Sequence, residues 1–373
     1  MSVDQYNFNG MTGRPFRILS LAVVLASWLG APGAVAQIDP RTALLEKAGW
    51  DALTAGEAQK AAESFRAALA GDPGNARLHL GAGVAAYLER RDDEARMELE
   101  RALVLDPRLT EARTVLGQVQ HRMGDVRGAI STLDLVVANA PGDVAARATL
   151  ERWRRELELH DRMQQAIGER FTVSFEGPSE AALANEALAS LDRAYWRIGA
   201  ILGAYPTTAV PVVLYTTEQF RDVTRSPAWA AGAYDGTIRV PMRGALDKRD
   251  ELDRVLAHEF THALVRTLAA RGVPTWLNEG LASALEADDL TWAGERVRKA
   301  PARIPPNTLQ SGFSRLDGAQ AQLAYATSAL AVRRMLDEAG GAAMANLLRD
   351  LGEGVDFEVA FPHRMRRPLA DLE

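Results

Sequence analysis

The sequence predicts an all-α solenoid of helical repeats in its N-terminal half and an α+β domain in its C-terminal half. The first prediction rests on a 34-residue period that runs from Thr42 to Asp143. The second rests on strand-like and helix-like patterns that alternate between residues 169 and 373. With 373 residues, of which 47% are hydrophobic, the chain is long enough to bury two separate cores.

The first segment of the chain has the pattern of an export signal. Arg14 and Arg17 precede an uncharged apolar run from Ile18 to Leu29, and Ala34-Val35-Ala36 matches a small-residue cleavage site. The apolar run is shorter than the roughly 20 residues that a membrane-spanning helix needs, so a permanent anchor is the less favoured interpretation. We therefore expect cleavage after Ala36 and a periplasmic or secreted protein.

Composition excludes several classes of site and partner. The chain has no cysteine, which excludes disulfides, cysteine-ligated zinc and a thiol nucleophile. Its formal net charge is −6, without a basic cluster interleaved with aromatic residues, so no nucleic-acid partner is expected.

Three units of the repeat, at about 42–75, 76–109 and 110–143, share five aligned positions. These are Gly49, Gly83 and Gly117; Ala61, Ala95 and Ala129; Phe65, Leu99 and Leu133; Ala68, Ala102 and Val136; and Pro73, Pro107 and Pro141. Small residues let paired helices approach closely, and proline cannot continue a helix because it lacks the N–H. The pattern resembles the tetratricopeptide repeat, which implies three helix pairs stacked into a solenoid.

The second unit departs from this pattern at the turn between its two helices. The first and third units have Gly56 and Gly124 there, whereas the second has Arg90. The aligned apolar positions are all filled, so the repeat prediction stands for all three units.

The last unit needs a cap, because each repeat buries its apolar face only against a neighbour. Residues Val144 to Ile167 form a charge-rich helical pattern that predicts this cap, and the solenoid is expected to cover residues 37–168. Two roles remain open for it. The solenoid could bind a peptide or protein partner on its concave surface, or it could be a rigid spacer for the following domain.

The elements of the C-terminal domain, residues 169–373, follow from local patterns. Strands are predicted at Phe171–Phe175 and Val210–Tyr215, a long helix at Ser179–Leu202, and a hairpin at Tyr234–Val240 around an Asp-Gly turn. Two terminal helices are predicted at Gln320–Glu338 and Ala342–Leu351, and a proline-rich loop at Asp289–Gln310 that could cover a cleft.

The most informative feature of the chain is the string His258-Glu259-Phe260-Thr261-His262 in a predicted helix. Residues i and i+4 of a helix lie on one face, so both imidazoles can bind one metal ion. Glu259 beside them could deprotonate a metal-bound water. Zinc suits imidazole ligands, and a catalytic zinc site uses three protein ligands with one position open for water.

The third ligand is predicted to be Glu279. It lies shortly downstream in the run Pro274 to Ala282, which has a helix start and an apolar side. Gly280, next to it, is expected to leave space beside the metal. The first motif alone occurs by chance in many helices, and the downstream Asn278-Glu279-Gly280 makes a zinc site the favoured interpretation.

These motifs resemble those of the gluzincins, zinc metallopeptidases whose third ligand is a glutamate on the helix after the His-Glu-x-x-His helix. More narrowly, residues 255–265 and 274–285 are similar to the bacterial peptidase MA-like domain, as are residues 231–236 and 324–328 outside the core motifs. The resemblance covers roughly Arg170 to Glu373. It implies an α+β gluzincin-like (thermolysin-like) fold.

The resemblance also implies residue roles. His258, His262 and Glu279 would bind one zinc ion per chain, and Glu259 would be the general base. Related gluzincins use a tyrosine from a later helix to stabilise the oxyanion, and Tyr325 occupies a family-like segment. Tyr325 could equally be a packed core tyrosine. Tyr234 and His363 are weaker alternatives for the same role.

In gluzincins the strand before the active-site helix forms the edge of the sheet beside the cleft, where a peptide can add as a further strand. Here that strand would be Ile238 to Met242, although an ordinary edge strand fits equally well. The sequence therefore predicts an exported zinc metallopeptidase that acts on peptides or proteins. The alternative is a repeat-based scaffold whose peptidase-like domain binds zinc but has little or no activity.

Overall fold

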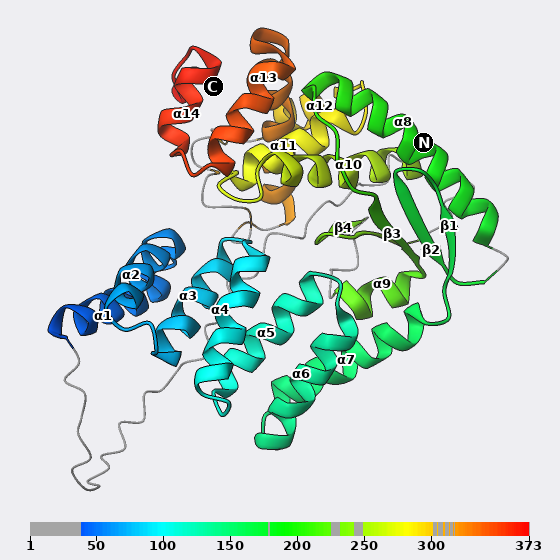
Figure 1. Cartoon of the computed structure of the whole chain (residues 1–373). Coiled ribbons are helices and arrows are strands. Elements are labelled where there is room, and N and C mark those ends of the chain that lie inside the picture. The colour runs from blue at the N-terminus through cyan, green and yellow to red at the C-terminus, as the bar shows by residue number, and fades with distance from the viewer. Residues whose placement is uncertain are drawn as a thin grey trace, which may run out of the picture. The chain divides into compact units, whose positions relative to one another are not determined.

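The computed structural model describes residues 39–177, 180–224, 232–241, 249–300 and 318–372, together with residues 304, 309, 313 and 316. The described chain divides into two compact units, which meet in sequence between Leu157 and Glu158 (Figure 1). The predicted export signal lies outside the described residues. Among the residues that are described, no helix combines the length and the apolar character needed to cross a membrane.

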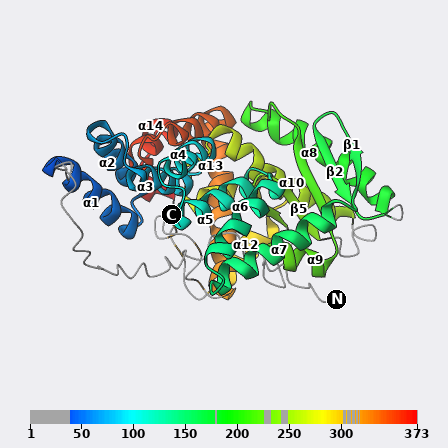
Figure 2. The same ribbon diagram turned by 60° about the horizontal axis from the view of Figure 1, so that its bottom comes forward.

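The first unit is a solenoid of paired helices (Figure 2). Its helices are α1 (Pro40–Ala55), α2 (Ala58–Gly71), α3 (Ala76–Leu88), α4 (Asp92–Leu105), α5 (Thr110–Arg122), α6 (Val126–Asn139) and α7 (Val144–His160). Each predicted repeat unit contains one helix pair, and α7 follows the last pair as a cap, although its last three residues, Glu158 to His160, belong to the second unit. The all-α repeat prediction is confirmed.

The aligned small and large residues pack against each other inside the repeats. Phe65 is completely buried, and a Cβ atom placed on Gly49 would lie only 2.7 Å from its ring. In the second unit a Cβ atom on Gly83 would lie 2.7 Å from Cγ of Leu99. In these two units glycine therefore makes room for the large side chain of the paired helix, whereas a Cβ atom on Gly117 of the third unit would lie 3.5 Å or more from its neighbours.

The turn inside each repeat requires a left-handed backbone. Gly56 and Gly124 have φ of 79° and 85°, and Arg90 adopts the same region with φ of 61°. A side chain in this region costs about 1–2 kcal/mol relative to its usual conformations. The helix pair thus imposes the turn geometry on the second unit even without glycine.

The second unit is built on a five-stranded sheet in the order β1-β2-β3-β5-β4. The strands are β1 (Gln164–Ile167), β2 (Phe171–Phe175), β3 (Val210–Tyr215), β4 (Ala233–Tyr234) and β5 (Ile238–Pro241). β2, β3 and β5 run parallel, and the edge strands β1 and β4 are antiparallel to their neighbours.

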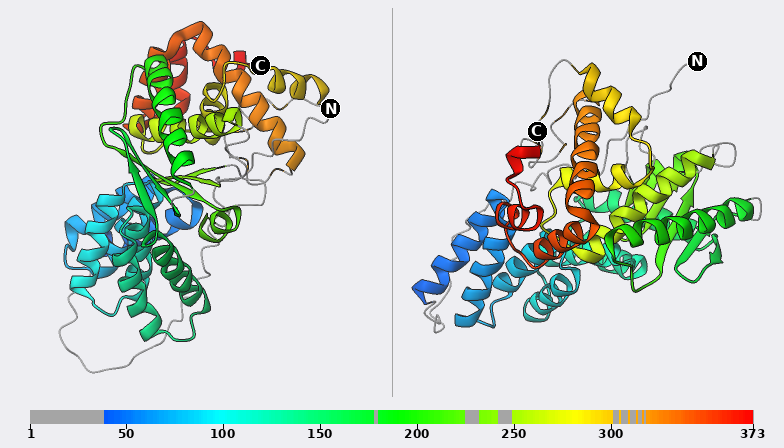
Figure 3. Two further views of the ribbon diagram at one scale, coloured as in Figure 1. Left: turned by 90° about the vertical axis from the view of Figure 1, so that its right-hand side faces the viewer. Right: turned by 90° about the horizontal axis from the view of Figure 1, so that it is seen from above.

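Helices cover both faces of this sheet, with α8 (Ala181–Leu202) and α10 (Arg249–Leu268) on one face and α9 (Thr217–Thr224) on the other (Figure 3). The unit also contains α11 (Thr275–Leu285), α12 (Thr291–Lys299), α13 (Gly318–Gly352) and α14 (Phe357–Met365), followed by a 3₁₀ turn at Leu369–Leu372. Val212 and Leu214 of β3 belong to the core that contains α8 and α10, whereas Val213 and Tyr215 pack with Phe220 of α9.

Most predicted elements of this domain are present. The strands at 171–175 and 210–215, the long helix before Gly203 and the hairpin at 234–240 all form. The two predicted terminal helices form α13, which is broken at Gly340, where φ is 80° and ψ is 164°. The α+β prediction is confirmed.

Several local predictions were wrong. The predicted cap to Ile167 ends at His160, because residues 164–167 pair with β2 instead. The predicted loop at 289–310 contains α12, which packs against α13, and most of its remainder lies outside the described residues. The sequence also missed α9 and α14.

The predicted edge strand is not at the edge. β5 lies between β3 and the two-residue strand β4, which pairs with it through the hairpin. The edge of the sheet on this side is therefore β4, at Ala233 and Tyr234. β4 becomes the edge strand because it pairs with β5 across the Asp-Gly turn. The residue pattern of 238–242 alone does not show that another strand pairs with this segment.

Phe65→Ala is expected to lower the free energy of unfolding of the solenoid by about 3–5 kcal/mol, because it leaves a cavity between two helix pairs. Leu44→Ala is the matched control, since Leu44 lies on α1 with 68% of its surface exposed. Urea unfolding of the full chain, followed by circular dichroism, measures both. Equal losses in the two variants would contradict this account of the repeat core.

Candidate metal centre

Two adjacent helices carry the candidate metal centre (Figure 1). His258 and His262 lie one turn apart on α10, and Glu279 lies on α11. The connection between these helices includes Gly272 with φ of 79°, where a Cβ atom would lie 2.6 Å from the carbonyl oxygen of Leu351. Only glycine fits this turn, which returns the chain so that α11 packs against α10.

The three side chains converge on one point. Nε2 of His258 lies 3.8 Å from Oε2 of Glu279, and Nε2 of His262 lies 3.7 Å from the same oxygen. One ligand atom from each residue lies within 4.8 Å of the others. Ligand atoms around a single tetrahedral zinc ion are separated by about 3.4 Å, as follows from its bond lengths. The cluster therefore fits one metal ion after small side-chain movements.

The other nitrogen of each imidazole is held by a second residue. Nδ1 of His258 lies 2.8 Å from Oε2 of Glu286, and Nδ1 of His262 lies 3.1 Å from Oδ1 of Asn278. Such a contact fixes the ring orientation and the tautomer, and it leaves Nε2 available as the ligand atom. Both imidazoles are thus oriented for metal binding by residues of α11 and its C-terminal end.

Sequence reasoning assigned no role to Glu286 or Asn278. The signal was the spacing on α11: Glu286 follows Glu279 by two helical turns, so the two carboxylates share a helix face. Asn278 directly precedes the predicted ligand. Neither spacing says which histidine a side chain reaches, because that depends on how α10 and α11 pack.

The charges in this buried centre favour a cation. Burial lowers the pKa of His258, but interactions with Glu279 and Glu286 outweigh it and raise that pKa to about 10. Burial raises the pKa of Glu279, yet His262, His258 and a hydrogen bond from Tyr325 together bring it below its usual value. The carboxylates therefore attract positive charge, and two imidazoles with one carboxylate are a donor set that suits Zn²⁺.

Glu259, the predicted base, is buried beside the cluster with 5% of its surface exposed. Burial raises the pKa of Glu259 and nearby carboxylates raise it further, whereas the charge of His258 lowers it. The net result is a pKa of about 8. A Cβ atom on Gly232 would lie 2.6 Å from Oε1 of Glu259, so the chain just before β4 passes directly beside this carboxylate.

Tyr325 of α13 also reaches the centre. It is 5% exposed, its ring packs edge-on against Phe313, and its hydroxyl donates to the Glu279 carboxylate. Of the two weaker alternatives, His363 lies exposed on α14 near Asp350, and Tyr234 lies half-buried in β4. Among these three candidates, Tyr325 has the observed contact with a predicted ligand.

Gly280 does not face the metal centre as the sequence reasoning expected. A Cβ atom there would lie 2.7 Å from the carbonyl oxygen of Ser328 and 2.8 Å from Cγ2 of Val332. Gly280 therefore lets the backbones of α11 and α13 approach closely. This contact brings Tyr325, one turn before Ser328 on α13, beside Glu279.

Family models match both parts of the chain. Residues 191–365 match the model of the Peptidase MA superfamily, and residues 46–110 match a tetratricopeptide repeat model. The first match contains the whole candidate metal centre. The second lies within the solenoid.

Individual proteins resemble parts of the chain. DnaJ protein P58IPK homolog B of Oryza sativa subsp. japonica is 31% identical over 120 residues, which cover 31% of this chain and 26% of the rice protein. The Sgt2 TPR domain from Aspergillus fumigatus is 23% identical, with 37% of this chain and 93% of that chain covered and a TM-score of 0.33. The second TPR domain of human RPAP3, in complex with an HSP70 peptide, is 24% identical, with 30% and 95% covered and a TM-score of 0.29.

Gly280→Ala is expected to lower the free energy of unfolding by about 1–3 kcal/mol, because the added methyl group meets backbone atoms of α13. Gly294→Ala in α12 is the control: nothing lies within 4 Å of its Cβ position. The control should be neutral or gain up to ~1 kcal/mol from helix propensity. Thermal unfolding measures both, and an unaffected Gly280 variant would refute the close packing.

Glu286→Ala is expected to weaken Zn²⁺ binding by about 10- to 100-fold, because His258 loses the partner that orients its ring. Competition with a chelator of known affinity measures the change. Glu295→Ala, on the exposed surface of α12, is the control and should bind Zn²⁺ as the wild type does. Unchanged affinity in the Glu286 variant would exclude the orienting role.

Proposed function

Because the chain carries a Peptidase MA superfamily domain after tetratricopeptide repeats, we propose that it is an exported zinc-dependent metallopeptidase. One observation carries the proposal. Nε2 of His258 and Nε2 of His262 lie 3.8 Å and 3.7 Å from Oε2 of Glu279, with the carboxylate of Glu259 buried next to them. The substrate class is a peptide or protein.

Each side chain of the centre has a distinct task in this proposal. Zinc, when bound, would polarise the scissile carbonyl and make a water more acidic. Glu259 takes the proton from the attacking water and delivers it to the leaving amine. Tyr325 donates its hydroxyl proton in a hydrogen bond to the oxygen that gains negative charge. Its hydrogen bond to Glu279 supports this role, because Glu279 is a proposed ligand of the ion that would hold the substrate carbonyl.

The edge of the sheet offers a place for the substrate backbone. β4 is the edge strand, and the chain just before it passes beside Glu259. A peptide that pairs with β4 as a further strand would bring its carbonyl groups next to the base. This replaces β5, the strand that the sequence predicted for this role.

The solenoid and the N-terminal segment complete the proposal. Stacked helix pairs of this kind form an extended surface, which we propose binds the substrate or a protein partner. The basic, apolar and cleavage-site pattern of residues 14–36 supports export to the periplasm or beyond.

Glu259→Gln is expected to lower kcat on peptides by about 10²- to 10⁴-fold, because the amide cannot accept the proton of the attacking water. Zn²⁺ content should remain that of the wild type. Digestion of a peptide library, read by mass spectrometry, measures the cleavage, with Glu338→Gln on an exposed helix face as the control. If the wild type and the Glu259 variant were equally inert while both bound zinc, the scaffold alternative would hold.

Tyr325→Phe is expected to lower kcat by about 10²- to 10³-fold and to change KM little, because the lost hydrogen bond forms mainly in the transition state. The substitution keeps the ring that packs on Phe313. Steady-state kinetics on a peptide identified in the library measure both constants. A variant with unchanged kcat would remove Tyr325 from the mechanism and leave it a core tyrosine.

A further inference from the structure

The face of the sheet opposite α10 contains a buried arginine that the proposed mechanism does not use. Arg239 lies in β5 with 6% of its surface exposed, between β3 on one side and β4 on the other. Its neighbours on this face, Val213 and Tyr215, are also buried. A charged side chain in such a place needs hydrogen-bond partners, because burying it unpaired is costly.

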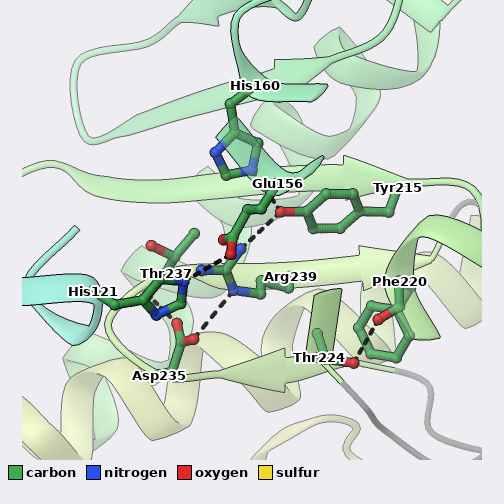
Figure 4. Close-up of polar contacts among 9 residues, drawn as sticks. All are labelled: His121, Glu156, His160, Tyr215, Phe220, Thr224, Asp235, Thr237 and Arg239. Atoms are coloured by element: carbon green, nitrogen blue, oxygen red, sulfur yellow. Dashed lines mark hydrogen bonds and ion pairs between the residues drawn. The ribbon is translucent and has the colours of Figure 1, made fainter. Parts of the chain in front are cut away.

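Two of its partners come from the neighbouring strand and the neighbouring turn (Figure 4). Nη1 of Arg239 donates to the hydroxyl oxygen of Tyr215 at 2.7 Å, and Nε donates to Oδ2 of Asp235 at 3.2 Å. The other carboxylate oxygen of Asp235 accepts from the backbone N–H of Thr237 at 3.2 Å. Arg239 thus ties the turn of the β4–β5 hairpin to β3.

The tyrosine is itself held in place. Tyr215 is completely buried, and its hydroxyl lies 2.7 Å from Nε2 of His160. The hydroxyl accepts from Arg239 and retains its own proton for a second bond, so it can donate to the imidazole. The hydroxyl group to which Arg239 donates is therefore fixed in position by burial and by His160.

The hairpin that Arg239 holds lies against the catalytic base. Arg239 is directly opposite Ala233 in the pairing of β4 with β5, and Gly232 immediately precedes Ala233. A Cβ atom on Gly232 would lie 2.6 Å from Oε1 of Glu259 and 2.8 Å from its Cγ. A small displacement of the hairpin must therefore change the space available to the Glu259 carboxylate.

We infer that Arg239 is a positioning residue that fixes the β4–β5 hairpin and, through Gly232, the carboxylate of Glu259. The catalytic part of this inference rests on the proposed peptidase function. Arginine suits the task because its planar guanidinium reaches two partners in fixed directions, whereas lysine offers one point of charge. The inference extends the active site to the opposite face of the sheet.

The first test measures the hairpin itself and needs no activity. Hydrogen exchange of the full-length protein is compared for the wild type, Arg239→Met, Tyr215→Phe and Arg334→Met. Arg334 is the matched control, since it forms an exposed ion pair with Glu338 on α13. In Arg239→Met, amides of residues 232–240 should exchange about tenfold faster or more, while α10 and α11 stay protected.

Tyr215→Phe removes a single hydroxyl group and keeps the ring, so it provides the evidence if Arg239→Met does not fold. Its hairpin amides should exchange faster than those of the wild type, and the control should match the wild type. Unchanged exchange of residues 232–240 in the folded Arg239 or Tyr215 variants overturns the inference.

The second test measures catalysis at constant metal content. Arg239→Met and Arg239→Lys should each lower kcat by about tenfold or more with KM and Zn²⁺ affinity little changed, because the base is misplaced while the ligands remain. Gly232→Ala should have a similar effect, and the double variant with Arg239→Met should lose less than the product of the two losses. The inference is overturned if the double variant loses the full product of the two single losses in kcat, or if Arg239→Lys has the kcat of the wild type.

The two tests separate failure of the inference from failure of the proposed function. If the wild type cleaves no peptide, the peptidase proposal fails, and hydrogen exchange alone decides whether Arg239 holds the hairpin. If the wild type is active but the hairpin and kcat are insensitive to Arg239, the peptidase proposal stands and the inference fails.

Discussion

The close packing of α11 against α10 and α13 is the constraint on which the candidate centre depends. Two histidines on α10 can share an ion with Glu279 only if α11 lies directly beside them. Gly272 permits the turn between these helices, and Gly280 permits the backbone contact with α13. The same contact brings Tyr325 to Glu279. Gly272 and Gly280, which have no side chains, thus determine where the four candidate side chains His258, His262, Glu279 and Tyr325 meet.

The centre also concentrates buried carboxyl groups. Glu259, Glu279 and Glu286 are each at most 6% exposed, and they surround two imidazoles. Unpaired carboxylates in such a place are costly, so the arrangement is stable only with positive charge among them. Protonated His258, whose pKa is raised to about 10, supplies such a charge, and a divalent metal ion held by the imidazoles would supply it in the same place. The electrostatics of the centre therefore suit the ion of the proposed function.

Both faces of the sheet help to position the candidate centre. Its front face packs on α8 and α10, and its edge strand β4 brings Gly232 beside Glu259. The back face carries Arg239, Tyr215 and Asp235, which join β3 to the hairpin turn. Rigid scaffolds of this kind hold catalytic groups more precisely than loops do. The hairpin is short, and only two residue pairs join β4 to β5. Side-chain hydrogen bonds therefore add to the stability that this short backbone pairing provides.

The sequence by itself determined the repeat solenoid and the α+β class of the second domain, and it predicted the candidate residues His258, Glu259, His262 and Glu279. The first two follow from a 34-residue repeat and from alternation along strands, the histidine pair from the i and i+4 positions of a helix, and Glu279 from the motif around it. Only the tertiary structure decided that Glu286 and Asn278 orient the histidines, that β4 is the edge strand, and that Gly280 faces α13. The physical reason is that these contacts join segments far apart in the chain, and their geometry is set by how helices and strands pack, which local patterns do not contain.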